Sequence, residues 1–244
     1  MKTIVETKAL KKSFGSFQAV KGVNLSVYAG EIFGFLGPNG AGKTTTLRIL
    51  TTLLSPDSGE ATVAGFDLLK AQHEVRRRIG YVSQVGGADR QATGRENLLL
   101  QGRLYGMHQG EASKRAERLI EMFTLGECAN KITSTYSGGQ RRRLDIALGM
   151  MHKPLVLFLD EPSTGLDPQN RVNLWEQIRQ LKGEGMTIFL TTHYLEEADA
   201  LSDRIAIMDH GQITTVGTPA ELKGVEALSL HDVFLQKTGK GLRE

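Results

Sequence analysis

One short glycine-rich stretch constrains the fold of this chain more than any other feature. Residues 37–44 read Gly-Pro-Asn-Gly-Ala-Gly-Lys-Thr, which is a glycine, four residues, and then Gly-Lys with a hydroxyl residue. The mostly apolar residues 32–36 before it are typical of a buried strand, and residues 44–54 after it have the pattern of a helix. A strand, a tight loop and a helix in this order make a cradle for phosphate groups. The sequence therefore predicts a nucleoside triphosphate site.

The residues of this cradle have separate expected roles. Backbone N–H groups and the positive end of the helix dipole would hold the β-phosphate. Lys43 would reach the β- and γ-phosphates, and Thr44 would ligate Mg²⁺. A glycine-rich turn that fits the pattern by accident is the alternative, and the flanking strand and helix disfavour it. The nucleotide-binding set from this stretch is Gly37, Pro38, Asn39, Gly40, Ala41, Gly42, Lys43, Thr44 and Thr45.

Composition bounds the size of the core and the kinds of partner. The chain has 244 residues and is 40% hydrophobic, which is enough for one substantial core with a smaller inserted lobe. With 30 basic and 27 acidic residues, the net charge of +3 gives little reason to expect nucleic acid as a partner. The single cysteine, Cys128, fits a reducing compartment, and no stretch approaches the roughly 20 apolar residues of a membrane span. We expect a cytoplasmic chain that does not itself cross a bilayer.

The hydrophobic pattern changes along the chain and predicts one domain with distinct parts. Alternating apolar residues in 3–36 suggest antiparallel strands that form a platform for the nucleotide base. From residue 93 to about 125 the period is helical, which indicates a helical lobe inserted into an α/β body. Beyond the lobe, strands alternate with helices, which favours a mostly parallel sheet. The expected parts are an α/β core of about 1–90 and 152–220, a helical lobe of about 91–151, and a short tail of 221–244.

Two carboxylates, Asp160 and Glu161, follow the apolar run 155–159. A buried parallel strand would end here, at the edge of the sheet where ligands of α/β proteins bind. Because adjacent strand residues point to opposite faces, we expect the two acids to differ in role. We assign Asp160 to Mg²⁺ through water and Glu161 to the attacking water as general base. A polar strand end that only makes a turn is the alternative, which the cradle upstream disfavours.

The stretch before these acids makes a family resemblance specific. Residues 136–141 read Tyr-Ser-Gly-Gly-Gln-Arg and resemble the signature motif of ATP-binding cassette (ABC) proteins, which more often begins with leucine. Gln84 resembles the glutamine-loop residue of that family, and His193 its switch histidine. Residues 163–167, which end in Asp167, are similar to its dimer-contact loop. The motifs occur in the family order from about residue 8 to 218.

The resemblance implies that a working site is shared between two chains. In the family, the signature loop closes on the γ-phosphate held by the opposite subunit, so this loop and Asp167 would serve the ATP of a partner. The same residues begin a helix whose free N–H groups form an anion site. A helix that is only N-capped is the alternative, and both can hold. The basic run 141–143 is interpreted as partly a surface face and is left out of the site. The residues assigned to the partner's nucleotide are Ser137, Gly138, Gly139 and Gln140.

The resemblance also implies the remaining catalytic and base-binding residues. Gln84 would sense Mg²⁺ and water beside the membrane partner, and His193 would hold Glu161 and the water in line. Without the resemblance, Gln84 would be interpreted as an ordinary amide in a loop and His193 as a histidine with only a structural role. Phe14 stands where the family places an aromatic residue that stacks on adenine, more often a tyrosine, and Val20 is assigned to the same base site. Lys43 completes the catalytic set.

Three further stretches resemble the drug- and antibiotic-exporter ATPases of the daunorubicin-resistance type: residues 93–106, 192–199 and 230–239. This implies an ATP-hydrolysing subunit that pairs with a second copy of itself, or a paralogous subunit, and drives a separate membrane permease, with export favoured. Its contact with the permease is expected near Gln84 and residues 85–96. One alternative is a soluble ABC ATPase of translation or DNA repair, but these usually fuse two cassettes or insert a long coiled coil. Another is a GTPase-like phosphate-loop protein, which the signature argues against.

Overall fold

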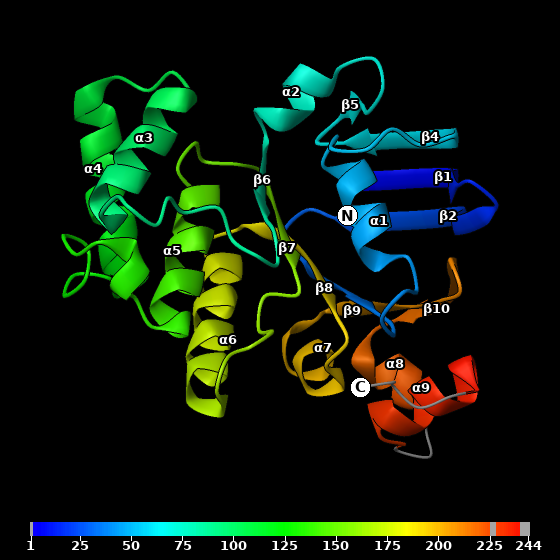
Figure 1. Ribbon diagram of the computed structural model, residues 1–244. Coiled ribbons are helices and arrows are strands. Elements are labelled where there is room, and N and C mark those ends of the chain that lie inside the picture. The colour runs from blue at the N-terminus through cyan, green and yellow to red at the C-terminus, as the bar shows by residue number, and fades with distance from the viewer. Residues whose placement is uncertain (1, 225–227, 240–244) are drawn as a thin grey trace.

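A six-stranded sheet lies at the centre of the residues 2–224 and 228–239 that the computed structural model describes (Figure 1). Its strand order is β10-β9-β3-β8-β7-β6. Neighbouring strands in the described sheet run parallel except β10, which is antiparallel to β9. The mostly parallel sheet expected from the alternation of strands and helices is thus confirmed. The strands are β3 (Ile32–Leu36), β6 (Ile79–Val82), β7 (Val156–Asp160), β8 (Thr187–Thr192), β9 (Arg204–Asp209) and β10 (Gln212–Gly217).

A second, antiparallel sheet has the strand order β2-β1-β4-β5. It is the β subdomain predicted for the N-terminal part of the chain. Its first two strands form a hairpin, and at the hairpin tip Phe14 pairs with Phe17 across a two-residue turn. The strands are β1 (Thr3–Phe14), β2 (Phe17–Tyr28), β4 (Ser58–Val63) and β5 (Phe66–Asp67).

Helix α1 (Lys43–Leu50) lies between the two sheets, because it contacts β2 on one side and β7 and β8 on the other. Its residues Leu47, Ile49 and Leu50 are completely buried. Each such side chain stabilises the fold by about 1.5–3 kcal/mol. The helix ends earlier than the predicted residue 54, because Thr52 adopts a left-handed conformation with a φ of 62°. The phosphate loop is therefore anchored to a helix that both sheets hold in place.

A helical lobe stands beside the sheet, in green on the left of Figure 1. Its helices are α3 (Gly94–Leu104), α4 (Gln109–Met122) and α5 (Gly138–Gly149), and α6 (Pro168–Gly183) packs beside α5. A capping box starts α3: Thr93 accepts the N–H of Glu96, and the Glu96 carboxylate accepts the N–H of Thr93. The lobe shares one hydrophobic core with a face of the sheet, which includes Leu98, Leu119, Phe123, Leu144, Leu157 and Ile188.

Short helices cover the other end of the sheet. They are α7 (Leu195–Leu201), α8 (Pro219–Lys223) and α9 (Leu230–Thr238). A further short helix, α2 (Gln72–Arg76), contacts β5 and the edge strand β6, and a 3-10 turn lies at Thr133–Thr135 in the lobe. Helix α9 buries Val233 and Phe234 in a small cluster with Ile205 and Ile207 of β9. Parts of the expected tail, at 225–227 and 240–244, lie outside the described residues. Within the described ranges, no helix has the length and apolar character needed to cross a membrane.

Candidate ATP-binding and hydrolysis site

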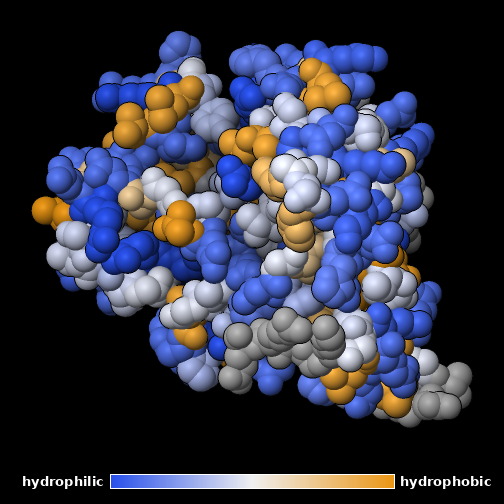
Figure 2. All heavy atoms as spheres, turned by 45° about the vertical axis from the view of Figure 1, so that its right-hand side comes forward, coloured by the Kyte–Doolittle hydropathy of each residue, from blue (hydrophilic) through white to orange (hydrophobic). Residues whose placement is uncertain are grey.

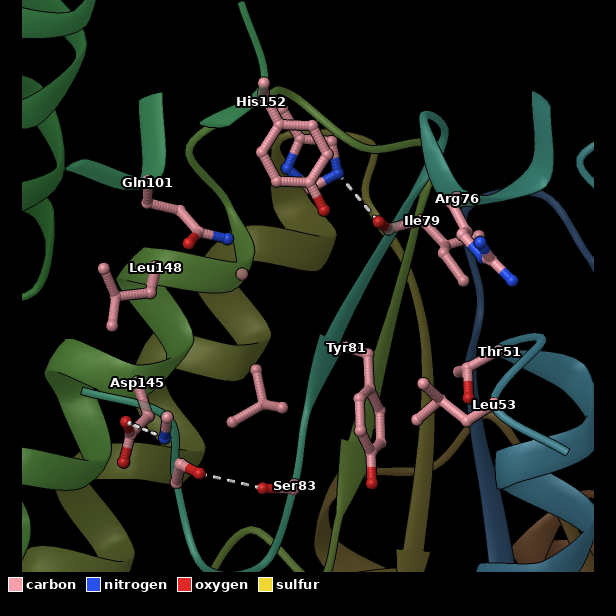
Figure 3. A pocket seen from close by; sticks show the side chains of 15 residues that line it. Thr51, Leu53, Arg76, Ile79, Tyr81, Ser83, Gln101, Asp145, Leu148 and His152 are labelled. Atoms are coloured by element: carbon pink, nitrogen blue, oxygen red, sulfur yellow. Dashed lines mark hydrogen bonds between the residues drawn. The ribbon is translucent and has the colours of Figure 1, made fainter. Parts of the chain in front are cut away.

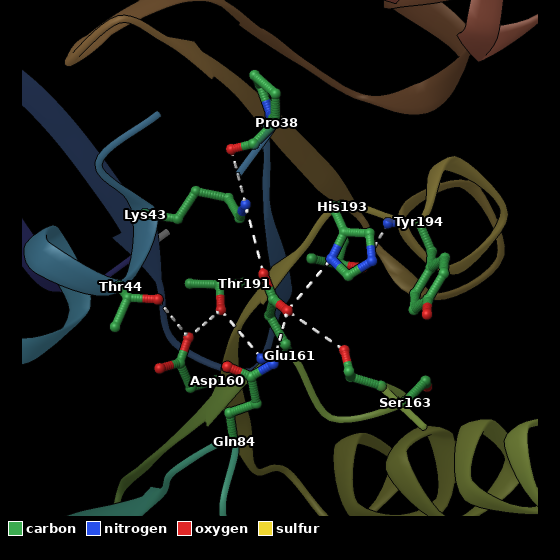
Figure 4. Close-up of polar contacts among 12 residues, drawn as sticks. Pro38, Lys43, Thr44, Gln84, Asp160, Glu161, Ser163, Thr191, His193 and Tyr194 are labelled. Atoms are coloured by element: carbon green, nitrogen blue, oxygen red, sulfur yellow. Dashed lines mark hydrogen bonds and ion pairs between the residues drawn. The ribbon is translucent and has the colours of Figure 1, made fainter. Parts of the chain in front are cut away.

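The phosphate loop closes around the side chain of Lys43, the first residue of α1. Its Nζ donates hydrogen bonds to the carbonyl oxygens of Gly37 (2.8 Å) and Pro38 (3.1 Å), and Figure 4 shows the lysine in this position. Gly42 precedes the helix with a φ of 106°, and a Cβ atom there would lie 2.4 Å from the carbonyl oxygen of Ala19. Only glycine fits at this point, because β2 passes so close to the loop. The unpaired N–H groups at the start of α1 make this loop an anion site.

A cavity of about 620 Å³ opens over the loop. It joins the hairpin tip of the antiparallel sheet, the phosphate loop, and the segments that follow β6, β7 and β8. The two halves of the site predicted from distant parts of the sequence therefore meet at one cavity. The residues that line it are Phe14, Phe17, Ala19, Asn39, Gly40, Gly42, Lys43, Thr44, Thr45, Gln84, Glu161, Thr164 and His193.

Thr44 and Asp160 form the side of the site that suits a metal ion. The hydroxyl groups of Thr44 and Thr191 both donate to Oδ1 of Asp160, at 3.1 and 2.6 Å. No group of three or more histidine, cysteine or acidic side chains placed to hold a metal occurs in the described part of the chain. Mg²⁺ nevertheless fits, because it takes few protein oxygens and completes its octahedron with phosphate and water. Thr44, Gln84 and Asp160 are oxygen donors that would hold it.

Glu161 does not continue the strand geometry on which its predicted direction rested. Strand β7 ends at Asp160, and Glu161 has a left-handed φ of 45°, which costs about 1–2 kcal/mol for a residue with a Cβ atom. Its N–H donates to the carbonyl and hydroxyl oxygens of Thr191, both at 3.1 Å. The alternation of faces therefore does not apply, and that part of the prediction is wrong. The two acids still have different partners, because Glu161 lies 3.5 Å from Lys43 and Asp160 bonds to Thr44.

Several polar side chains converge on the Glu161 carboxylate in Figure 4. Gln84 Nε2 donates to Glu161 Oε2 at 3.3 Å, and the Thr164 hydroxyl donates to the same oxygen at 3.2 Å. His193 Nδ1 lies 3.2 Å from that oxygen, but it has no hydrogen bond of good geometry to any described residue. Burial lowers the pKa of Lys43, while the negative charge of Glu161 opposes that shift. This arrangement can bind a polyanion beside a carboxylate that takes up a proton.

The side of the cavity that faces the hairpin tip carries two aromatic rings. Phe14 is 51% exposed and Phe17 is 62% exposed, and both line the cavity. Phe17 was not predicted from the sequence. Its position across a short turn from Phe14 could have indicated it, because residues opposite each other in a hairpin lie close together. Val20 does not belong to this surface, because its side chain is completely buried in the core between the sheets. Ala19, one residue earlier on β2, lines the cavity in its place.

The signature residues lie at the start of α5, and none of them lines this cavity. Ser137 Oγ accepts the N–H of Gln140, and the Gln140 side chain accepts the N–H of Ser137, so the predicted N-cap is present. Ser137 and Gly138 are exposed, and a Cβ atom on Gly139 would lie 2.3 Å from Asn170. Asp167 is the N-cap of α6, where it accepts the N–H of Asn170 at 2.9 Å. The signature therefore presents an anion site to the outside of the chain.

The basic run at 141–143 was interpreted as partly a surface face, and for Arg142 that interpretation is wrong. Its side chain is buried and reaches the segments on either side of the catalytic acids. Helical spacing could have predicted that Arg142 is buried, because Gly139, Arg142 and Ile146 fall on one face of α5. Thr164 and Thr191 were also missed, since a lone threonine after or within an apolar strand has no distinctive pattern.

A phosphate loop, a paired carboxylate after a neighbouring parallel strand and an oxygen-rich metal side together define a phosphate-loop ATPase. A family model described as ABC transporter matches residues 20–164. The chain belongs to the ABC transporter family of ATP-binding proteins. It is an ATPase that uses ATP and Mg²⁺ and is coupled to transport, and the interpretation as a translation or DNA-repair ATPase is not favoured.

Relatives and solved structures agree with this membership. The chain is 49% identical to the daunorubicin/doxorubicin resistance ATP-binding protein DrrA of Streptomyces peucetius, over 93% of this chain and 71% of that protein. It is 40% identical to the linearmycin resistance ATP-binding protein LnrL of Bacillus subtilis, over 99% of this chain and 76% of that protein. Among solved structures, the ATP-binding subunit of an ABC transporter is 27% identical with a TM-score of 0.85, over 96% and 99%. A dimeric ATP-binding cassette in a post-hydrolysis state with ADP and Pi is 28% identical with a TM-score of 0.80, over 88% and 98%.

Proposed function

We propose that this chain is the ATPase subunit of an exporter of drugs, antibiotics or other hydrophobic compounds, bound through a separate permease to the cytoplasmic face of the cell membrane. The observation that carries the proposal is the convergence of Lys43, Gln84 and His193 on Glu161 in one cavity. Export is supported by relatives named for daunorubicin, doxorubicin and linearmycin resistance and for Nod factor export.

Each residue of the cavity has a role in hydrolysis. The Lys43 ammonium binds the β- and γ-phosphates, and Phe14 stacks on the base. Glu161 accepts a proton from the attacking water, and His193 and Gln84 orient the Glu161 carboxylate and that water. Thr44 and Gln84, and Asp160 through water, would hold Mg²⁺, which would supply positive charge to offset the charge of the phosphates.

A second chain completes the site. Ser137 and Gly138 are exposed at the positive end of α5, away from the cavity of their own chain. A helix N-terminus in this position binds a phosphate that comes from outside. Together with Gly139 and Gln140, these residues contact the γ-phosphate bound by a second copy of the chain or a paralogous subunit, and Asp167 lies in the loop that meets the same nucleotide site of the partner. The dimeric cassette with a TM-score of 0.80 supports this arrangement.

The permease docks in a groove between the helical lobe and the core. This cavity of about 370 Å³ is shown in Figure 3, with Gln101, Leu148 and Asp145 on the lobe wall and Thr51, Leu53 and Arg76 on the core wall. On the face drawn in Figure 2, hydrophobic side chains gather in small separate groups among hydrophilic ones. The groove is a concave site, and such a site suits a helix or loop of a partner.

A stacked pair of rings closes one end of this groove. The rings of Tyr105 and His152 lie 3.7 Å apart at an angle of 2°, and His152 Nε2 lies 2.7 Å from the carbonyl oxygen of Ile79. Burial lowers the pKa of His152 and favours its neutral form. The pair joins the lobe to β6, so this end of the groove is preformed.

One short loop borders both the groove and the ATP cavity. Gln84 lines the ATP cavity, while Ser83, Gly86 and Gly87 line the groove. A partner element in the groove therefore contacts the same segment that touches Glu161. Movement of the lobe on ATP closure is transmitted to the permease through this loop.

Efflux from cells that express the chain with a candidate permease tests the proposal. We expect the chain to appear in the membrane fraction only with its permease, and efflux to require ATP. Glu161→Gln keeps the chain in the membrane fraction and abolishes efflux. ATP hydrolysis by the purified pair without efflux of any hydrophobic compound tested would contradict the export part. Absence of hydrolysis would contradict the catalytic part.

A further inference from the structure

Arg142 on α5 is buried, with 7% of its surface exposed, and its guanidinium donates three hydrogen bonds to backbone carbonyl oxygens. Nε donates to Pro162 at 2.8 Å, Nη2 to Asp160 at 3.0 Å and Nη1 to Ser83 at 2.6 Å. These carbonyl groups belong to two different loops. A planar, forked donor can hold both loops at once, which a single ammonium cannot.

The three carbonyl groups flank the residues assigned to catalysis. Asp160 and Pro162 are the neighbours of Glu161, and Ser83 precedes Gln84. Glu161 is held in a left-handed conformation that its neighbours must enforce, since a residue with a Cβ atom disfavours it. Arg142 holds the peptide group that precedes Glu161, through the carbonyl of Asp160, and the peptide group one residue further on, through the carbonyl of Pro162. It therefore acts on the direction of the Glu161 carboxylate without touching it.

Helix α5 also holds the loop on the other side of Gln84, through a second residue. Asp145, one turn beyond Arg142, accepts the N–H groups of Gly87 at 2.9 Å and Ala88 at 3.2 Å. A Cβ atom on Gly86 would lie 2.4 Å from the Asp145 carboxylate, so the loop lies directly against α5. Burial lowers the pKa of Arg142, and Asp145 and other carboxylates oppose that shift. The buried guanidinium is thus compensated by both charge and hydrogen bonds.

We propose that Arg142 is a positioning residue that ties the signature helix to Glu161 and Gln84 of its own chain. This inference rests on the proposed dimer, in which the N-terminus of α5 meets the ATP of the partner. When that N-terminus engages the partner's γ-phosphate, α5 moves as a unit, and Arg142 carries the loops of Glu161 and Gln84 with it. Binding at one ATP site thereby aligns the general base of the other.

The chain provides a matched control on the same helix. Arg143 follows Arg142, but its side chain makes no hydrogen bond or ion pair with the described residues, and its Nε is unpaired. Arg142→Gln and Arg143→Gln remove the same charge from adjacent positions. Arg142→Lys keeps the charge but removes the fork, and it serves as a second variant with a smaller risk of unfolding.

The experiment measures kcat, KM and the Hill coefficient for ATP hydrolysis by the full chain. We expect Arg142→Gln and Arg142→Lys to lower kcat by about 10–100-fold, to leave KM within about threefold, and to reduce the Hill coefficient toward one. Arg143→Gln should stay within about twofold of the wild type. If the wild-type chain hydrolyses ATP without cooperativity, the proposed dimer is contradicted. The positioning role of Arg142 within one chain is then still tested by comparing kcat of the Arg142 variants with kcat of Arg143→Gln.

A second measurement separates positioning from a purely structural role. In a Glu161→Gln background, Arg142→Lys should still form the ATP-bound dimer, because binding does not depend on the direction of residue 161. Unchanged kcat in both Arg142 variants would overturn the proposal. The proposal would also be overturned if both Arg142 variants lost ATP affinity, dimer formation and melting temperature to the same degree, because these losses together indicate that the whole chain is destabilised.

Discussion

The ammonium group of Lys43 lies 3.5 Å from the carboxylate of Glu161, although 118 positions separate them in the chain, and both side chains are nearly buried. The cation that binds phosphate and the acid proposed to activate water therefore share one space. Substitutions at the two positions should have different effects, since the role proposed for Lys43 is to bind the nucleotide and the role proposed for Glu161 is to act only on the water.

Glu161→Gln should leave the affinity for ATP within a few-fold of the wild type and lower turnover by about 100-fold or more, because the amide cannot accept the proton. Lys43→Ala should weaken binding as well as turnover, since it removes a charged phosphate contact. Equilibrium binding of a fluorescent ATP analogue and steady-state phosphate release measure both. Glu176→Gln on the exposed side of α6 is the control. Normal turnover in Glu161→Gln would remove that residue from the role of base.

The proposed shared site predicts dimers that depend on ATP. Glu161→Gln should trap an ATP-bound dimer, because the nucleotide is not hydrolysed, and the specific activity of the wild type should rise with protein concentration. Light scattering with the mutant, at high ATP and with Mg²⁺ withheld, shows the dimer directly. Gly138→Asp at the exposed start of α5 should prevent it by placing a negative charge against the γ-phosphate. A Glu161→Gln chain that stays monomeric at every ATP concentration argues against the shared site.

The second ring at the hairpin tip should contribute to binding of the base. Phe17→Ala should weaken ATP binding by about 5–150-fold, which corresponds to about 1–3 kcal/mol of stacking. Phe17→Tyr retains the ring and should bind as the wild type does. Inorganic tripolyphosphate has no base, so its affinity should stay within about twofold. An equal loss for ATP and tripolyphosphate would show that the substitution disturbs the phosphate loop instead.

A permease segment seated in the groove should also contact Val85 and Leu104, which do not line the groove themselves but adjoin its lining residues Gly86 and Tyr105. Val85 is 92% exposed and Leu104 is 72% exposed, so Val85→Glu and Leu104→Glu should not disturb the fold. Basal hydrolysis by the isolated chain should be unchanged, whereas co-purification with the permease and efflux should fall by about tenfold or more. Ala88 lies within the expected contact segment but is unsuitable for this test, because it packs against the core of the lobe.

Val216→Glu on β10 is the matched control for the groove variants, since β10 is the edge strand farthest from β6. Its efflux should equal that of the wild type. Normal efflux with both groove substitutions would place the permease elsewhere on the surface.

Glu197 on α7 makes stability depend on pH. It is completely buried, and its carboxylate accepts hydrogen bonds from the Ser163 hydroxyl and from Trp175 Nε1. Burial raises its pKa above the usual 4.5. A carboxyl group whose pKa is raised by folding stabilises the folded state at pH values below the pKa of the unfolded chain. That contribution is lost as pH rises through the pKa of the folded chain. The melting temperature of the wild type should therefore fall relative to Glu197→Gln as pH rises above 4.5.

Thermal unfolding of both chains between pH 4 and pH 8 checks this difference, with about 2–4 °C expected per kcal/mol for a chain of this size. Glu196→Gln is the control, since the Glu196 side chain is 84% exposed. Trp175 is the single tryptophan of the chain and contacts Glu197, so its fluorescence reports on the same site. A constant difference in melting temperature across this range would contradict the raised pKa of Glu197.

Local sequence determined much of this protein. The phosphate loop, the strand before it and the helix after it follow from glycine spacing and apolar periodicity over a few residues, and the structure places them as predicted except that the helix ends at Leu50. The paired acids and the capped start of the signature helix were likewise readable, because turns, caps and strand ends are decided by neighbours in the chain.

Tertiary structure alone decided the direction and depth of several side chains. Glu161 enters the cavity through a left-handed backbone that two bonds to Thr191 support, and no local pattern predicts such a conformation. Arg142 is buried because carbonyl groups from two distant loops accept its hydrogen bonds, and Val20 is withdrawn from the base site because two sheets close over it. Burial and long-range hydrogen bonds depend on residues far apart in sequence, so they exist only once the sheets and the lobe have packed together.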